Sequence, residues 1–190
     1  MAVIRSEDNG YTWSAPTFVQ TDHYYHVTYC DGVKTDAYDG EGPGVDYVAA
    51  YHFSEDAAND FKTSVIYSTD AGETWQSSES VISYGGASAF ESGVTEAAIA
   101  KLSNGDLLLL ARCQYDGVDY LAKSISKDNG VTWQEKASLS NVPSVNTMPA
   151  MENYGDDIWL LWAGNNNMGG TSYMRFPLTL AYSDDDARCV

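Results

Sequence analysis

Arginine is the residue whose type and scarcity in this sequence most directly suggest chemistry. The chain has four arginines, Arg5, Arg112, Arg175 and Arg188, against 27 aspartates and glutamates. A guanidinium group donates paired N–H bonds to a carboxylate, a geometry that the lysine ammonium cannot reproduce. Two arginines at one site would therefore hold the carboxylate of an acidic ligand, whereas an isolated arginine in so acidic a chain can pair with a nearby acid of the protein instead.

A repeated octapeptide indicates how such residues are positioned. The pattern S-x-D-x-G-x-T-W occurs at residues 6–13, 68–75 and 126–133, and a degenerate copy without the Gly, Thr and Trp occupies residues 183–190. The first residues of successive copies are 62, 58 and 57 positions apart. A nearly constant period is typical of proteins whose supersecondary units are stacked or arranged radially.

Each complete copy, which we call a box, is interpreted as a tight turn before a strand. The Ser hydroxyl and Asp carboxylate can accept bonds from backbone N–H groups, the Gly supplies a positive φ, and the Trp buries apolar surface. A calcium site is the weaker interpretation, since D-x-G alone lacks converging oxygens, and we expect no metal. The residues to which we assign this structural role are Ser6, Asp8, Gly10, Trp13, Ser68, Asp70, Gly72, Trp75, Ser126, Asp128, Gly130 and Trp133.

Between the boxes, apolar runs broken by turn residues predict short β-strands. The predicted strands are 2–5, 12–19, 23–30, 45–52, 62–68, 74–82, 96–102, 106–113, 118–126, 132–139, 145–151, 157–163 and 177–183. Four antiparallel strands per repeat indicate an all-β fold of β-propeller blades. We expect residues 1–190 to form a single segment of about three blades.

The expected strand order brings three distant residues to one rim. In an antiparallel meander, the start of the first strand, the end of the second and the start of the third lie at the same end of the sheet. Glu96 begins a first strand, Arg112 ends a second and Arg175 stands just before a third. The boxes join third strands to fourth strands, and we expect them at the opposite rim.

Together with two longer segments, the boxes resemble those of the sialidases (neuraminidases), whose six-bladed propellers carry such Asp-box or BNR repeats. VTEAAIAKLSNGDLLLLAR is similar to the segment in which a catalytic-site Glu opens an inner strand and an Arg closes the next, which matches Glu96 and Arg112, 16 residues apart. RFPLTLAYSDDD is similar to the segment that carries a second sialic-acid-binding Arg, matched by Arg175. VPSVNTMPAM also resembles a family segment, so the resemblance covers essentially the whole chain as a middle portion of the catalytic domain.

The resemblance implies an exo-α-sialidase-like, retaining glycoside hydrolase without a cofactor. Arg112 and Arg175 would bind the sugar carboxylate, Glu96 would polarise a tyrosine nucleophile, and Asp22 would contact the sugar. Solvated acids are the alternative interpretation of Glu96 and Asp22. The family's first arginine, its Asp general acid and its Tyr nucleophile have no match in residues 1–190, so we expect this chain to be inactive by itself.

Other functions and weaker candidates remain open. A non-catalytic carbohydrate-binding propeller, or another glycan-cleaving enzyme such as one acting on uronic-acid polysaccharides, would keep the same fold. The weaker candidates comprise two loop residues that could line a pocket, three histidines interpreted as strand packing, and two tryptophans interpreted as core residues. They are Tyr115, Asp116, His23, His26, His52, Trp159 and Trp162.

Composition limits the partners. A net charge of -17 argues against nucleic acid and anionic membrane surfaces. The three cysteines lack C-x-x-C spacing, so neither a disulfide framework nor a zinc site is expected. The first residues do not read as a signal peptide, and localisation stays open, with a secreted or periplasmic parent as one option. We expect a glycan or sialoside as substrate, and self-association or contact with the rest of a longer parent, because incomplete repeats leave open sheet edges.

Overall fold

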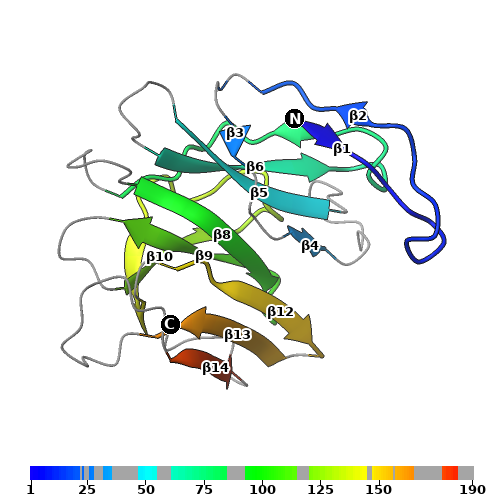
Figure 1. Cartoon of the computed structure of the whole chain (residues 1–190). Coiled ribbons are helices and arrows are strands. Elements are labelled where there is room, and N and C mark those ends of the chain that lie inside the picture. Colours follow the sequence, from blue (N-terminus) through cyan, green and yellow to red (C-terminus); the bar gives the residue numbers. More distant parts are fainter. Residues whose placement is uncertain are drawn as a thin grey trace.

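The computed structural model describes residues 1–21, 23, 26–27, 32–35, 47–54, 61–84, 93–114, 120–144, 147–155, 157–164 and 177–183. Within these ranges the regular elements are all β-strands, which confirms the predicted fold class. None of the described segments is a helix long and apolar enough to cross a membrane. Figure 1 shows the strands arranged in successive sheets from the N-terminal to the C-terminal part of the chain.

One meander has all four strands of the predicted unit. The strands β8 (Gly93–Lys101), β9 (Leu107–Gln114), β10 (Tyr120–Ser126) and β11 (Ser138–Pro143) pair in sequence order and antiparallel. The pairing of β8 with β9 and of β9 with β10 follows from the short connections between these strands, since a turn of a few residues can join only antiparallel neighbours. We call these four strands the central meander.

The preceding meander is built in the same way around two long strands. In it, β5 (Tyr47–Ser54) pairs with β6 (Phe61–Ser68), and β6 pairs with β7 (Gln76–Ser77). Two short strands, β3 (His26–Val27) and β4 (Gly32–Lys34), share the other edge of β5. A parallel pair between Phe61 and Gly93 joins this meander to the central one.

The two ends of the chain carry smaller sheets. At the N-terminal end β1 (Ala2–Val3) pairs with β2 (Thr17–Phe18), and at the C-terminal end β12 (Ala150–Tyr154), β13 (Asp157–Ala163) and β14 (Leu178–Ser183) form an antiparallel sheet. The last two predicted strands of this final sheet are confirmed almost to the residue. We call β12–β14 the terminal sheet.

Several predicted strand limits are wrong. The strand predicted at 132–139 begins only at Ser138, because residues 135–137 bond to the neighbouring meander through Ser83. Likewise the strand predicted at 74–82 is reduced to β7 and a bridge between Thr63 and Ile82. The strand predicted at 145–151 lies later, at Ala150–Tyr154, and that predicted at 12–19 is only Thr17–Phe18. For the strand predicted at 132–139, a contact between meanders that is absent from the local pattern sets the limit.

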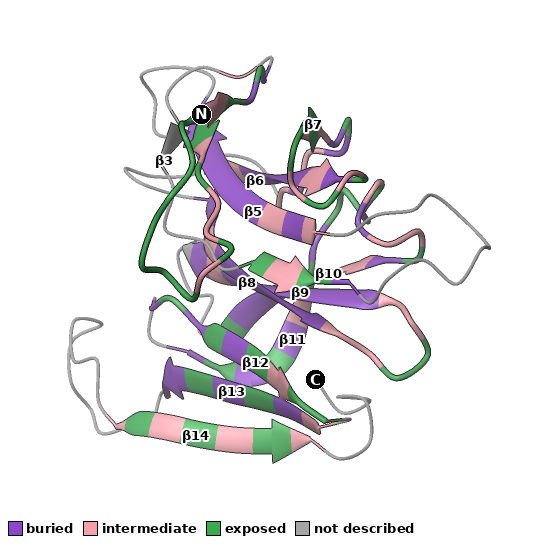
Figure 2. Ribbon diagram, turned by 90° about the vertical axis from the view of Figure 1, so that its right-hand side faces the viewer, coloured by how far each residue is buried: buried purple, intermediate pink, exposed green. Residues whose placement is uncertain are grey.

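The inner strands β8 and β9 of the central meander are buried on both faces, as Figure 2 shows. In β9, Leu107 and Leu109 pack toward β5, while Leu108 and Leu110 pack toward the terminal sheet. The continuous apolar run of this strand is what a sheet sandwiched between two others requires. Cys113 in the same strand is a free thiol whose pKa burial raises to about 12, so it is unreactive.

The terminal sheet is covered on one face only. Ile158, Leu160 and Trp162 are buried against the central meander, so core packing is confirmed for Trp162. Trp159 lies on the other face, 36% exposed, and stacks on Tyr182 with ring centroids 5.5 Å apart; the prediction that Trp159 is a core residue is wrong. Its exposed neighbours on this face include Leu161, Leu178, Leu180 and Tyr182.

Candidate functional site

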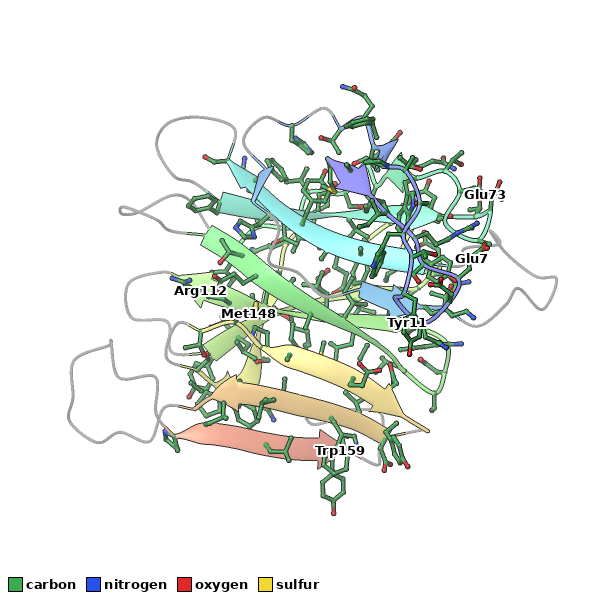
Figure 3. All side chains as sticks on the ribbon, turned by 45° about the vertical axis from the view of Figure 1, so that its right-hand side comes forward. Glu7, Tyr11, Glu73, Arg112, Met148 and Trp159 are labelled. Carbon is green, nitrogen blue, oxygen red and sulfur yellow. The ribbon has the colours of Figure 1, made fainter. Side chains whose placement is uncertain are left out.

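The strand register separates Arg112 from the boxes. Thr95 near the start of β8 lies opposite Arg112, whereas Ser126, which opens the third box, lies opposite Leu107 at the other end of β9. Figure 3 shows Arg112 at one end of the sheets and the box residues Glu7, Tyr11 and Glu73 at the other. The two rims therefore have the arrangement expected from the meander order.

Glu96 and Arg112 meet at the first of these rims. Arg112 Nη1 donates to Glu96 Oε2 at 3.0 Å, and the two side chains are only 15% and 22% exposed for Arg112 and Glu96, respectively. Partial burial lowers the screening by water, so each charge acts on the other, and on a bound charge, more strongly than at an open surface. The structure thus brings together two residues that are 16 positions apart in the sequence.

A β-bulge positions Glu96. The register between β8 and β9 shifts between Thr95 and Ala97, which leaves Glu96 as the extra residue with φ +49°. A bulge of this kind breaks the alternation of the strand and re-aims one side chain. Here it turns the Glu96 carboxylate toward the guanidinium of Arg112 on the next strand.

His52 contacts the same bulge from the preceding meander. The Glu96 N–H donates to His52 Nδ1 at 3.3 Å, and His52 is 5% exposed. Burial lowers the pKa of His52; the Glu96 carboxylate opposes this and the Arg112 guanidinium adds to it. The imidazole is therefore neutral at pH 7, as an acceptor at Nδ1 requires.

Two residues of this neighbourhood were not anticipated as site residues. His52 was interpreted as strand packing, and nothing local in the sequence marks its contact with Glu96, which is 44 positions away. Thr95 is buried opposite Arg112, and its hydroxyl has no hydrogen-bond partner among the described residues. In the sequence, the polar Thr95 directly before the candidate Glu96 is the local feature that marks this position.

The other predicted site residues cannot be placed. Arg175 and Asp22 lie outside the described residues, as do the weaker candidates Tyr115 and Asp116. Of the three rim residues predicted from the meander order, the structure therefore places Glu96 and Arg112.

The box turns have the hydrogen bonds that their sequence predicts. In all three, the Ser Oγ accepts the Gly N–H at 2.8 Å and the Asp Oδ1 accepts the Thr N–H at 2.8–2.9 Å. The Asp Oδ2 also accepts the Thr hydroxyl, at 2.6 Å. Hydrogen bonds from Thr12 and Thr74 hold the pKa of Asp8 and Asp70 below the ordinary value. Burial acts to raise the pKa of Asp128, but hydrogen bonds, chiefly from Thr132, outweigh it and the pKa is lowered there too. The carboxylates are thus engaged within their own turns.

One box departs from the prediction. Trp133 is 5% exposed and donates its indole N–H to Gly130 O at 3.0 Å, in agreement with a buried tryptophan. Trp13 of the first box is 59% exposed, so the expectation that it buries a large apolar surface is wrong. Among the described residues, the sheet to which the segments on either side of the first box belong is the short β1–β2 pair.

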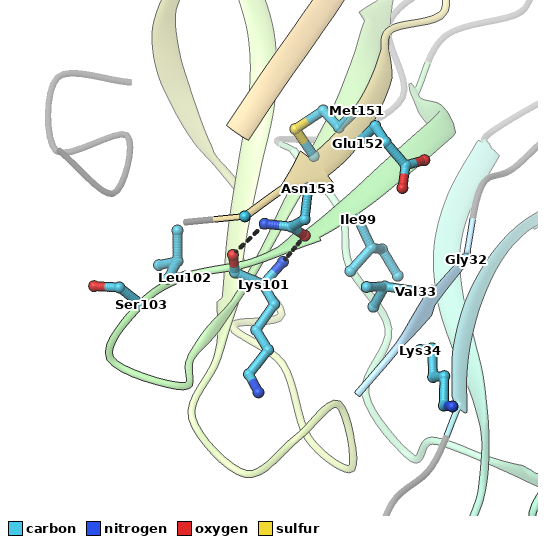
Figure 4. Close-up of a pocket in the computed structure, with 11 residues that line it drawn as sticks. Gly32, Val33, Lys34, Ile99, Lys101, Leu102, Ser103, Met151, Glu152 and Asn153 are labelled. Atoms are coloured by element: carbon cyan, nitrogen blue, oxygen red, sulfur yellow. Dashed lines mark hydrogen bonds between the residues drawn. The ribbon is translucent and has the colours of Figure 1, made fainter. Parts of the chain in front are cut away.

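A cavity of about 440 Å³ lies at the other end of β8 from Glu96 (Figure 4). Lys34, Lys101 and Glu152 are among its lining residues, and the Asn153 side chain bonds both the N–H and the carbonyl of Lys101 at 2.8 Å. On β8 the cavity is lined by Ile99 and Lys101, three and five residues beyond Glu96, or roughly 10 and 16 Å at about 3.3 Å per residue. The cavity is therefore distinct from the Glu96–Arg112 rim.

Comparison with known proteins agrees with this arrangement. Residues 1–189 match the model of the BNR repeat-like domain. The chain is 27% identical over 199 aligned positions to a sialidase of Paraclostridium sordellii, an alignment that covers 97% of this chain and 46% of that protein. The chain thus spans about half the length of this curated relative.

Solved structures share the fold at lower identity. The intramolecular trans-sialidase of Ruminococcus gnavus, in complex with oseltamivir carboxylate, superposes with a TM-score of 0.61 at 21% identity, over 87% of this chain and 33% of that one. Trypanosoma rangeli sialidase, in complex with the inhibitor DANA, gives a TM-score of 0.56 at 20% identity, over 91% and 28% of the two chains. These similarities show that the chain has the β-propeller type of fold found in sialidases.

Proposed function

Since the chain belongs to the family of BNR repeat-like domains, we propose that it is part of an exo-α-sialidase-like glycoside hydrolase that removes terminal sialic acid from glycoconjugates. The observation that carries this proposal is the Glu96–Arg112 pair, held by a bulge at the rim opposite the boxes. The sialidase of P. sordellii, similar over nearly the whole chain, supports the same substrate class.

In this proposal Arg112 binds the carboxylate of the sugar. Its guanidinium offers paired donors in a plane, and the contact with Glu96 fixes the orientation of that plane. Arg175 supplies the second guanidinium and Asp22 a contact to the sugar. The attraction between these guanidinium groups and a ligand carboxylate is stronger here than at an open surface, because partial burial weakens screening by water.

Glu96 has a second role in the proposal. By the resemblance to sialidases, it polarises a tyrosine nucleophile contributed by a part of the protein other than residues 1–190. As the tyrosine hydroxyl passes its proton to the Glu96 carboxylate, its oxygen attacks the anomeric carbon, the glycosidic C–O bond breaks, and the aglycone leaves as an alcohol with a proton from the general acid. Water then hydrolyses the tyrosyl-glycosyl intermediate, which frees the tyrosine hydroxyl and releases the sugar with retention of configuration. A neutral phenol suits this task, since a carboxylate nucleophile would repel the anionic sugar.

The experiment is a fluorogenic α-sialoside assay on the full-length protein and its variants. Glu96→Gln removes the charge that polarises the nucleophile, and we expect kcat/KM to fall by about 10²–10³, as when one preorganised electrostatic group is lost. Arg112→Lys keeps the charge but loses the paired donors, and we expect KM to rise by about 10- to 100-fold, the equivalent of one charged hydrogen bond.

The chain offers a matched control at the opposite rim. Arg5 pairs with Glu7 at 2.7 Å at a more exposed position, so Arg5→Lys disturbs an Arg–Glu pair away from the site and should leave kcat/KM unchanged. Full turnover by both Glu96→Gln and Arg112→Lys would contradict the proposed roles. A full-length protein that binds sialic acid in titration calorimetry but releases none from the sialoside would instead be a carbohydrate-binding propeller.

We also propose that the exposed face of the terminal sheet is covered in the functional protein, by the remainder of a longer chain or by a second copy. Leu178, Leu180 and Tyr182 are 59–69% exposed on a strand without charged residues, and such faces pack against further sheets. We expect residues 1–190 alone to associate and Leu180→Glu to abolish the association, measured by light scattering. A monomer at high concentration before any substitution would overturn this proposal.

A further inference from the structure

Glu96 has a positive φ, a backbone conformation that residues other than glycine seldom adopt. Among the described residues other than glycine, positive φ occurs at Glu96 and at three residues of the boxes, Asn9, Ala71 and Asn129. The box residues precede the glycine of a tight turn, whereas Glu96 lies within a strand. A residue held in this way inside a sheet is found where surrounding groups enforce the conformation, often at functional sites.

Two groups enforce it here. Arg112 Nη1 holds the side chain of Glu96 at 3.0 Å, and His52 Nδ1 holds its backbone N–H at 3.3 Å. His52 belongs to β5, in the meander before the one that contains Glu96. The bulge is thus fixed across the boundary between two meanders.

The boundary beside His52 is itself firmly joined. Phe61 pairs with Gly93 at the start of β8, and the Thr63 hydroxyl donates to Val94 O at 2.8 Å with both groups buried. Thr63 is the residue of β6 that lies opposite His52. The position of the imidazole relative to the bulge is therefore set by one strand pairing and one side-chain hydrogen bond between β6 and β8.

We propose that His52 is a positioning residue for Glu96, and that the Glu96 carboxylate is correctly aimed only while the His52 imidazole is uncharged. An uncharged ring accepts the Glu96 N–H at Nδ1 and carries its proton at Nε2. A second proton, at Nδ1, would make this nitrogen a donor that faces the Glu96 N–H, and the hydrogen bond between His52 and Glu96 would be lost. The consequence for turnover rests on the proposed function, whereas the contact itself does not.

The surroundings of His52 favour the uncharged ring. In the described part of the molecule, the charged groups that face it are the Glu96 carboxylate on β8 and the Arg112 guanidinium on β9. From β6 it meets the ring of Phe61, edge-on at 5.8 Å, and the uncharged Thr63. Burial, the largest influence, lowers the pKa of His52 from its ordinary value of 6.5, and Glu96 opposes this less strongly.

The sign of the pH dependence follows. Because the pKa of His52 is lowered in the folded protein, its contribution to stability is complete above pH 6.5 and is lost as the pH falls below 6.5 toward the folded pKa. The alignment of Glu96 should be lost at the lower end of this range, as the pH falls through the folded pKa and the ring itself takes up a proton. Turnover should then show an acid limb that belongs to His52.

The turnover experiment uses the full-length protein with two substitutions of His52. Asparagine places an amide oxygen near the position of Nδ1 and does not titrate, whereas leucine offers no acceptor. We expect His52→Leu to lower kcat/KM by about 10- to 100-fold, as for a misplaced reacting group. We expect His52→Asn to keep most of kcat/KM and to lose the acid limb that belongs to His52. His23→Asn is the matched control, because His23 stacks on Phe53 at 3.7 Å, and its pH profile should match that of the unaltered protein.

A nitrogen NMR measurement on the same proteins separates this proposal from the proposed function. We expect the His52 ring nitrogens to show the Nε2–H form, with a pKa below 6.5, and the Glu96 amide resonance to shift in His52→Leu but far less in His52→Asn. If the protein cleaves no sialoside yet the NMR result holds, the proposed function fails and the contact stands. If sialoside is cleaved with the same kcat/KM and pH profile in His52→Leu, or if Nδ1 carries the proton at pH 7, the positioning role is overturned.

Discussion

The box turns and the Glu96 bulge both hold a residue other than glycine at φ between +49° and +59°, but they hold it by different means. In a box, the groups that bond the turn lie within eight consecutive residues. At the bulge, the holding groups are His52 and Arg112, which lie 44 and 16 positions away. The first conformation is therefore encoded locally, and the second exists only once two meanders have packed.

The difference corresponds to a difference in role. The three boxes repeat one hydrogen-bond pattern, in which each Asp carboxylate accepts hydrogen bonds from the Thr of its own turn. The Glu96 carboxylate is bonded by a guanidinium at a partly buried rim, where both groups can also act on a ligand. A box turn, which is bonded by its own residues, connects two strands. The Glu96 conformation, which is held by residues of other strands, positions a carboxylate beside Arg112.

The largest effect that tests this comparison is expected at the third box. In Gly130→Ala the new Cβ would lie 2.7 Å from Val48 Cγ2 and φ is +90°. The positive φ costs about 1–2 kcal/mol, and overpacking a buried site costs about 1–3 kcal/mol. We expect urea denaturation to show the free energy of unfolding reduced by about 3 kcal/mol in total.

Gly10→Ala is the control for this prediction. It has the same backbone conformation, φ +87°, but the nearest atom to its Cβ would be Trp13 Cζ2 at 3.8 Å, an ordinary contact. We expect only the backbone cost, about 1–2 kcal/mol. Equal losses in the two variants would mean that the third box does not depend on its packing against β5.

The same distinction explains what the sequence could predict. The boxes, the all-β fold and the central meander follow from patterns a few residues long, and the antiparallel order was enough to put Glu96 and Arg112 at one rim. The contact between His52 and Glu96 could not be predicted, because it depends on how β5 packs beside β8. For the same reason the exposure of Trp13 and Trp159 was missed, since it depends on which sheets cover them.

A smaller effect tests whether the bulge is strained. Glu96→Ala and Glu96→Gly both remove the carboxylate and its bond to Arg112, so they differ only in the backbone. In an ordinary strand glycine is the less stable of the two by about 0.5–1 kcal/mol. At φ +49° the order should reverse, and we expect urea denaturation to show Glu96→Gly more stable than Glu96→Ala by about 1 kcal/mol.

Ala71→Gly completes this test in a box. Ala71 has φ +57° in a turn whose own bonds remain intact after the change, so we expect the free energy of unfolding to rise by about 0.5–1 kcal/mol. If Ala71→Gly raises the free energy of unfolding and Glu96→Gly is more stable than Glu96→Ala, then the positive φ destabilises a residue other than glycine at both positions. If Glu96→Ala were instead the more stable, the strand would relax to the ordinary β-conformation once the carboxylate is gone. The Arg112 contact, rather than His52, would then be what maintains the bulge.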